Sequence, residues 1–182
     1  MTLPRRVFLD TNVICFILDH TESILENDKP PRHLPSRDIQ DIEALSLIFQ
    51  TGQRAYWELA VSPLTYQEIM ATSDPNRRRT LEQWFDEILI YWRDCCDEDG
   101  SFSDSYASKI ENILRESKML SAFPDMNDRS LISHAIAYEC DAFCTRDHRT
   151  ILKRAHQAST LPIQIISPTD WANLIQPYAA LF

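Results

Sequence analysis

Glycine is nearly absent from this chain, which has only Gly52 and Gly100 among its 182 residues. Because the two stand far apart, neither a glycine-rich P-loop nor the GxGxxG turn of dinucleotide-binding folds can form. Long apolar runs are also missing, since none approaches the roughly 20 residues that span a bilayer. The first apolar run ends after three residues at Asp10, which is too short for the core of a signal peptide. We therefore expect a cytoplasmic protein with no membrane partner.

Zinc-finger cysteine spacing and an excess of positive charge are two further absences. The five cysteines show no metal-binding pattern, so we expect reduced and mostly buried thiols. The net charge of −9 counts against nucleic acid as a partner, because phosphate neutralisation favours basic faces. The length and the 44% hydrophobic content predict one globular domain over residues 1–182.

Short apolar runs alternate with longer amphipathic segments. The predicted strands are 6–9, 59–62, 142–145 and 163–167. Helical periodicity covers 39–50, 78–93, 105–120 and 129–139. A last helix begins at Ser167, with Pro168 in its first turn and Asp170 completing a capping box. This alternation predicts an α/β fold with a parallel sheet.

Two stretches interrupt this alternation. Residues 19–36 are polar and rich in proline, and we interpret them as a loop or clamp arm. Residues 72–124 form a helical excursion before the chain returns to the sheet.

Four carboxylates lie near the predicted strand ends. Asp10 directly follows the first strand, Glu68 stands six residues after the second, and Asp147 two residues after the third. Asp128 opens the helix that leads into the third strand. Each has an alternative explanation in helix capping, and for Glu68 this is a formal capping box that starts at Thr65.

Taken together, the four acids favour a metal site. The carboxyl ends of parallel strands share one edge of the sheet, where ligands bind. Carboxylates that converge there repel one another unless a divalent cation neutralises them. A donor set made only of oxygen atoms suits Mg²⁺ or Mn²⁺ rather than zinc. Such a site activates water and stabilises both oxygens of an in-line displacement at phosphorus.

Four motifs, VFLDTNVI, SPLTYQEI, NDRSLISHAIAYECDAFCTRD and IQIISPTDW, resemble the successive motifs of PIN-domain nucleases, a family that includes VapC-like toxin ribonucleases. The resemblance implies a three-layer sandwich whose central parallel sheet has four to five strands flanked by helices. It also implies RNA hydrolysis with one or two Mg²⁺ or Mn²⁺ ions. Matched by position, the metal-site acids are Asp10, Glu68, Asp128 and Asp147. Thr11, Asn12 and Thr145 would orient the carboxylates or a metal-bound water.

The resemblance leaves several questions open. Toxin members of the family pair with an antitoxin protein, and homodimers are common among them. This chain is longer than the compact toxins, with the surplus in 19–36 and 72–124, which makes a stand-alone nuclease an alternative. Asp125 stands three residues before Asp128 and is a second candidate ligand. Asp128 is preferred because Leu131 and Ile132 follow it at the family's spacing.

Basic side chains cluster directly after Asp147, and those nearest to it are Arg146, His148 and Arg149. We expect these three to hold the phosphates of the RNA substrate, although a solvated helix face is an equally ordinary reason for such residues. Two rival functions stay open. One is a PIN-like scaffold that binds RNA or protein without cleavage. The other is a HAD-like phosphatase, which needs a second acid at the position that Asn12 occupies.

Overall fold

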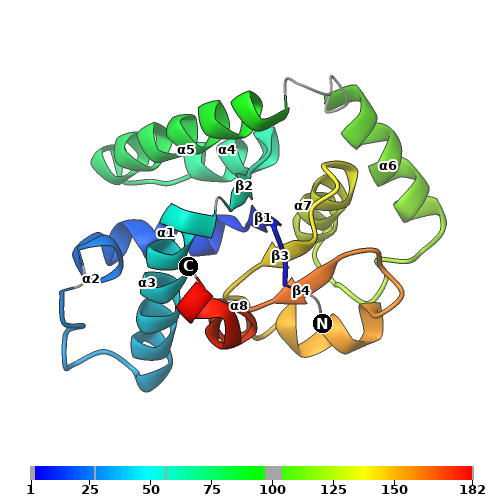
Figure 1. Cartoon of the computed structure of the whole chain (residues 1–182). Helices are drawn as coiled ribbons and strands as arrows, with labels where there is room; N and C mark the ends of the chain where they lie inside the picture. Colours follow the sequence, from blue (N-terminus) through cyan, green and yellow to red (C-terminus); the bar gives the residue numbers. More distant parts are fainter. Residues whose placement is uncertain (1–2, 27, 56, 97–103, 182) are drawn as a thin grey trace.

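Four parallel strands form the centre of the molecule (Figure 1). The structure is a computed structural model that describes residues 3–26, 28–55, 57–96 and 104–181. The strands are β1 (Arg6–Leu9), β2 (Glu58–Ala60), β3 (Ala142–Cys144) and β4 (Gln164–Ile166). Their order in the sheet is β2-β1-β3-β4. Phe8 is in register with Ala60 on one side and with Phe143 on the other. β1 is therefore a central strand with β3 as its direct neighbour.

Helices connect these strands. The α-helices of the described residues are α1 (Thr11–Asp19), α2 (Thr21–Leu25), α3 (Ser36–Ala55), α4 (Pro63–Met70), α5 (Pro75–Cys96), α6 (Asp104–Glu116), α7 (Met126–Ala137) and α8 (Pro168–Ile175). Two 3₁₀ helices follow β3 and α8, at η1 (Leu152–Ala158) and η2 (Gln176–Leu181). None of the helices in the part of the chain that the structure describes is long and apolar enough to cross a membrane.

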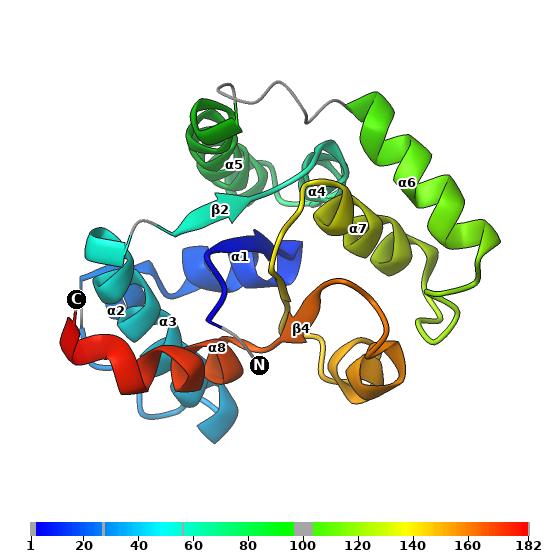
Figure 2. The same ribbon diagram turned by 45° about the vertical axis from the view of Figure 1, so that its right-hand side comes forward.

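Each face of the sheet has its own buried core. Because side chains alternate along a strand, Val7 and Leu9 lie in one core and Phe8 in the other. The first core includes apolar residues of α1, α3, α5 and α8, and the second those of α6 and α7. Figure 2 shows α6 and α7 together on one side of the strands, with α2 and α3 on the other. This α/β arrangement is compatible with a three-layer sandwich.

The predicted strands are all confirmed, each to within two residues at either end. The helices at 39–50, 78–93, 105–120 and 129–139 are confirmed as α3, α5, α6 and α7 with shifted ends. The predicted start of α8 is also right, because the hydroxyl of Ser167 accepts from the backbone N–H of Asp170 at 3.1 Å. Part of the predicted helical excursion, residues 97–103, lies outside the described residues.

The expectation of a loop at 19–36 is wrong for its first residues. Helix α1 continues to Asp19, and Thr21–Leu25 form the short helix α2. The reason is tertiary packing, since Ile24 is buried in the core shared with α1 and α3. Five residues with one fully buried apolar side chain are too few to show a helical period in the sequence.

Candidate metal centre

Asp10 and Thr145 lie side by side where two neighbouring strands end. Asp10 directly follows β1, and Thr145 directly follows β3. The backbone N–H of Asp10 donates to the carbonyl oxygen of Cys144 at 3.0 Å, so the β1–β3 pairing continues to this point. Because both strands run in the same direction, both side chains lie at the carboxyl edge of the sheet.

The carboxylate of Asp10 does not cap the helix that follows it. It makes no capping hydrogen bond to α1, although Asp10 occupies the N-cap position. Its Oδ2 accepts instead from Nδ2 of Asn12 and from the hydroxyl of Thr145, both at 2.6 Å. Asp10 is also only 5% exposed. Helix capping was the alternative explanation for Asp10, but its side chain bonds to Asn12 and Thr145 instead.

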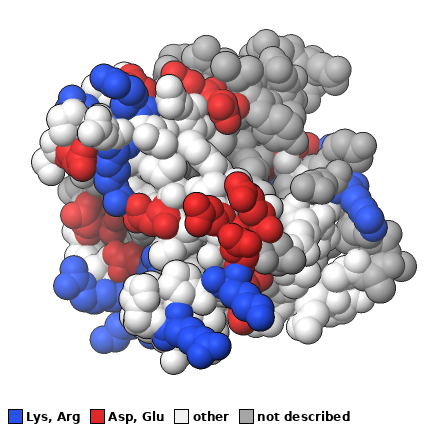
Figure 3. Space-filling view, turned by 90° about the vertical axis from the view of Figure 1, so that its left-hand side faces the viewer, with Lys and Arg blue, Asp and Glu red and all other residues white. Residues whose placement is uncertain are grey.

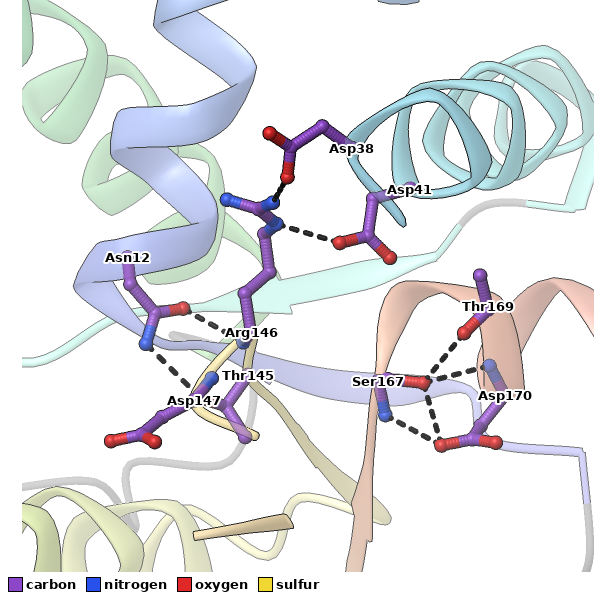
Figure 4. A network of polar contacts seen from close by, with 9 residues as sticks. All are labelled: Asn12, Asp38, Asp41, Thr145, Arg146, Asp147, Ser167, Thr169 and Asp170. Carbon is purple, nitrogen blue, oxygen red and sulfur yellow. Dashed lines mark hydrogen bonds and ion pairs between the residues drawn. The ribbon is translucent and has the colours of Figure 1, made fainter. Parts of the chain in front are cut away.

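The orientation of Asn12 follows from a third contact. Its Oδ1 accepts from the backbone N–H of Arg146 at 2.9 Å (Figure 4). The amide nitrogen therefore faces the other way, toward Asp10 and the hydroxyl of Thr145 at 3.1 Å. Asn12 and Thr145, both predicted to support the site, thus form one network with Asp10.

Glu68 is connected to Asp10 through Thr11. The hydroxyl of Thr11, the first residue of α1, donates to Oε2 of Glu68 on α4. The alternative for Glu68, a capping box that starts at Thr65, is wrong. Helix α4 begins at Pro63, and Thr65 lies in its first turn, where its hydroxyl accepts from the backbone N–H of Ser62 at 3.4 Å. The Glu68 side chain is therefore not needed for the helix start.

Asp128 and Asp147 share a single hydroxyl. Thr150 Oγ1 contacts Oδ2 of Asp147 and lies 3.4 Å from Oδ2 of Asp128. Oδ1 of Asp147 accepts from the backbone N–H groups of Arg149 and Thr150, each at 2.8 Å. Asp147 therefore caps the turn after β3, which agrees with the capping role given above as its alternative explanation. Its second oxygen still faces Asp128.

Asp125, and not Asp128, caps α7. Its exposed carboxylate accepts from the backbone N–H groups of Asn127 and Asp128 at 2.7 and 3.3 Å. Asp128 is half-buried and has no capping duty. The helix start explains Asp125, which leaves Asp128 as the acid of this pair that is available for a ligand.

The electrostatics of the site disfavour charge on two of the acids. The pKa of Asp10 is raised from its ordinary 3.8 to about 7, chiefly by burial and also by the neighbouring Glu68 and Asp128, against the lowering effect of the Thr145 hydrogen bond. Burial likewise raises the pKa of Asp128 to about 6, together with the charges of Asp125, Asp147 and Glu68. These shifts are typical of carboxylates that interact within one partly desolvated cluster.

Asp147 behaves differently from these two. Partial burial acts to raise its pKa, but the hydrogen bonds from the Thr150 hydroxyl and from two backbone N–H groups outweigh burial and lower it. The positive charge of Arg149 acts in the same direction. Asp147 therefore ionises more readily than Asp10 and Asp128.

The three predicted substrate-binding residues have different surroundings. The guanidinium of Arg146 pairs with Asp38 and Asp41 of α3, and its side chain is 19% exposed. His148 is half-buried, and its Nε2 has no hydrogen-bond partner among the described residues. Arg149 is exposed beside Asp147. Of the three, Arg149 alone is fully exposed, while Arg146 and His148 are partly buried.

The partners of Arg146 and the role of Thr150 were not predicted from the sequence. Asp41 is a charged residue on the apolar stripe of its helix with Leu45 and Ile48, and this pattern signals a buried ion pair. The sequence does not say which cation it pairs with, because Arg146 lies 105 residues away.

The donor chemistry of the site fits Mg²⁺ or Mn²⁺, because every candidate ligand is a carboxylate, hydroxyl or amide oxygen. The raised pKa values of Asp10 and Asp128 also indicate a cluster that a cation would stabilise. The described residues do not contain a group of three His, Cys, Asp or Glu side chains close enough to hold an ion as they stand. The carboxylates are neighbours rather than a closed coordination shell.

One face of the molecule carries charges of both signs in separate areas. Figure 3 shows acidic side chains gathered across the middle of one face, with lysine and arginine side chains beside and below them.

Comparison with known proteins found no match to a family model, to a curated protein or to a solved structure.

Proposed function

We propose that this chain is a Mg²⁺- or Mn²⁺-dependent endoribonuclease with a PIN-like fold. The observation that carries the proposal is the state of Asp10. It is a buried carboxylate at the end of a central parallel strand, it caps nothing, and two side-chain donors hold one of its oxygens. A buried charge without an ion-pair partner is costly. A bound cation would offset this cost and so explain why a carboxylate is buried here.

In this proposal Asp10, Glu68, Asp128 and Asp147 hold the cation, and the other residues position them. Asn12 and Thr145 keep Oδ2 of Asp10 in one orientation, and Thr11 does the same for Glu68. The chemistry that Mg²⁺ or Mn²⁺ supplies at such a site is activation of a water for attack on the phosphodiester and stabilisation of the charge that develops there.

The substrate is held by charge at the rim of the site. Arg149 is exposed next to Asp147 and can contact a phosphate of the RNA. The exposed guanidinium of Arg149 offers a positive charge next to Asp147 despite the net charge of −9. A toxin role with an antitoxin partner stays a prediction, which a small DNA-binding reading frame directly upstream of the gene would support.

The test compares the wild type with Asp10→Asn and a matched control, Asp74→Asn. Asp74 is exposed and caps α5 through bonds to two backbone N–H groups, and asparagine caps equally well. We expect Asp10→Asn to lose RNA cleavage in Mg²⁺ or Mn²⁺ by at least a hundredfold with the fold intact, and Asp74→Asn to cleave as the wild type does. Cleavage by Asp10→Asn at the parental rate would refute the proposal.

The second candidate is a PIN-like scaffold that binds RNA or a protein without cutting. The observation that favours it is that the acids do not form a closed group of three among the described residues. Calorimetry with Mn²⁺ separates the two candidates. The nuclease requires a stoichiometric Mn²⁺ site that is lost in Asp10→Asn, whereas the scaffold predicts no such site in either protein.

A further inference from the structure

Arg146 connects three elements that surround the candidate site. Its Nε donates to Oδ2 of Asp41 at 2.8 Å, and its Nη2 to Oδ1 of Asp38 at 2.5 Å, so the guanidinium bridges two acids of α3. Its Cζ lies 3.4 Å from the ring centroid of Phe16 on α1. Figure 4 shows the side chain extended from the end of β3 toward α3.

The same residue also contacts Asn12, through its backbone. The N–H of Arg146 donates to Oδ1 of Asn12, which directs Nδ2 of Asn12 at Asp10. Without this donor, the two ends of the Asn12 amide could exchange. The oxygen of the amide would then face the Asp10 carboxylate, and the hydrogen bond at 2.6 Å would be lost.

Burial makes the side-chain anchor of Arg146 strong. Asp41 is only 1% exposed, and its Oδ1 has no hydrogen-bond partner among the described residues. Arg146 is therefore the cation that compensates this buried charge, and release of the guanidinium would leave the carboxylate unpaired. The planar fork of arginine suits two acids at once, whereas lysine offers a single point charge.

We propose that Arg146 is a positioning residue and not a phosphate ligand. Anchored on Asp38 and Asp41, it holds its own backbone N–H against Asn12 and thereby sets the orientation of the Asp10 carboxylate. The inference rests on the proposed function for its catalytic consequence, but the coupling from α3 to Asn12 is a property of the chain itself. The acids of α3 thus act on the site without contacting it.

The test uses Arg146→Lys, Asp41→Asn and their combination, with Arg77→Lys as the matched control. Arg77 forms an arginine–aspartate pair with Asp19 at 2.8 Å, and both side chains of this pair are 40% exposed. The first readout is the pair of side-chain amide signals of Asn12 in ¹⁵N-resolved NMR of the metal-free protein. We expect both single variants to shift or broaden these signals, and Arg77→Lys to leave them unchanged.

The second readout is kinetic. We expect Arg146→Lys to lower kcat for RNA cleavage at least tenfold with less than a twofold change in KM. The combined variant should lose no more than Arg146→Lys alone, because both substitutions break the same connection. A rise in KM with kcat and the Asn12 signals unchanged would overturn the proposal and return Arg146 to phosphate binding. Additive losses in the combined variant would also overturn it.

Asp38→Asn covers the case in which Arg146→Lys does not fold. It removes one partner, leaves the buried pair with Asp41 in place, and should shift the Asn12 signals in the same direction by a smaller amount. Unchanged signals in Asp38→Asn then count against the proposal. A wild type that neither cleaves RNA nor binds Mn²⁺ refutes the proposed function and the catalytic part of this inference. The coupling itself does not depend on activity, and unchanged Asn12 signals in those variants that fold refute it.

Discussion

The hydroxyl of Thr145 donates to Oδ2 of Asp10 at 2.6 Å, across the ends of two adjacent parallel strands. Both residues are buried, and Thr145 is completely so. This bond is the largest of the contacts that lower the pKa of Asp10 against the effect of burial. It joins residues 135 positions apart, and it is the reason why the threonine after β3 belongs to the site.

Removal of this hydroxyl should weaken cation binding. In Thr145→Val the shape is kept but the donor is lost, so the pKa of Asp10 rises further above about 7. Because a ligand carboxylate must be ionised, we expect the Mn²⁺ dissociation constant to rise roughly 10- to 100-fold, the range typical of residues that orient metal ligands. Calorimetry at pH 7 measures it. Thr80→Val, on an exposed face of α5, is the control, and equal affinity in both variants would contradict this role for Thr145.

The metal-free protein should lose stability as the pH rises. Burial raises the pKa of Asp10 to about 7 and that of Asp128 to about 6. A carboxyl with a raised pKa in the folded state stabilises the protein fully below its ordinary pKa, near 4, and loses this contribution as the pH passes the raised value. We therefore expect the free energy of unfolding to fall between pH 4 and pH 8, by roughly 1.4 kcal/mol per pKa unit at most for Asp10.

Urea unfolding in a chelating buffer at pH 5 and pH 8 measures this fall. Asp10→Asn should show a flatter profile, because its amide does not titrate, and at pH 8 it should approach or exceed the stability of the wild type. Added Mn²⁺ should stabilise the wild type more at pH 8 than at pH 5, since protons compete with the cation. A wild type whose stability rises from pH 5 to pH 8 without metal would show that Asp10 is ionised at little cost.

The strand ends and their polar residues were predictable because they depend on local pattern. Short apolar runs bounded by polar residues identify parallel strands, and Asp10 and Thr145 follow such runs directly. Which partner a side chain chooses depends on long-range geometry that no period in the sequence encodes. Arg146 therefore looked like a surface cation among other basic residues, although it pairs with two acids more than 100 positions away. For Asp147 the sequence offered both a capping role and a metal-site role. In the structure one of its oxygens caps the turn after β3.

Asp125→Asn and Asp128→Asn should have different effects on Mn²⁺ affinity. Asp125→Asn keeps a good helix cap and removes a charge that raises the pKa of Asp128, so Mn²⁺ affinity should change less than threefold. Asp128→Asn removes a proposed ligand, and the affinity should fall at least tenfold. Thermal unfolding of both metal-free variants controls for loss of the fold. A larger loss of affinity in Asp125→Asn would make Asp125 the ligand and Asp128 its neighbour.

Arg149 should act on substrate binding rather than on the cleavage step. Its backbone N–H, which supports Asp147, is retained in Arg149→Ala, while the exposed guanidinium is lost. We expect KM for RNA to rise several-fold with kcat within twofold, and the dependence of KM on salt to weaken, because one phosphate contact fewer releases fewer counterions. Arg115→Ala, which removes another exposed arginine on α6, is the control. If kcat falls while KM and its salt dependence stay as in the wild type, the charge of Arg149 serves Asp147, whose pKa it helps to lower, and not the substrate.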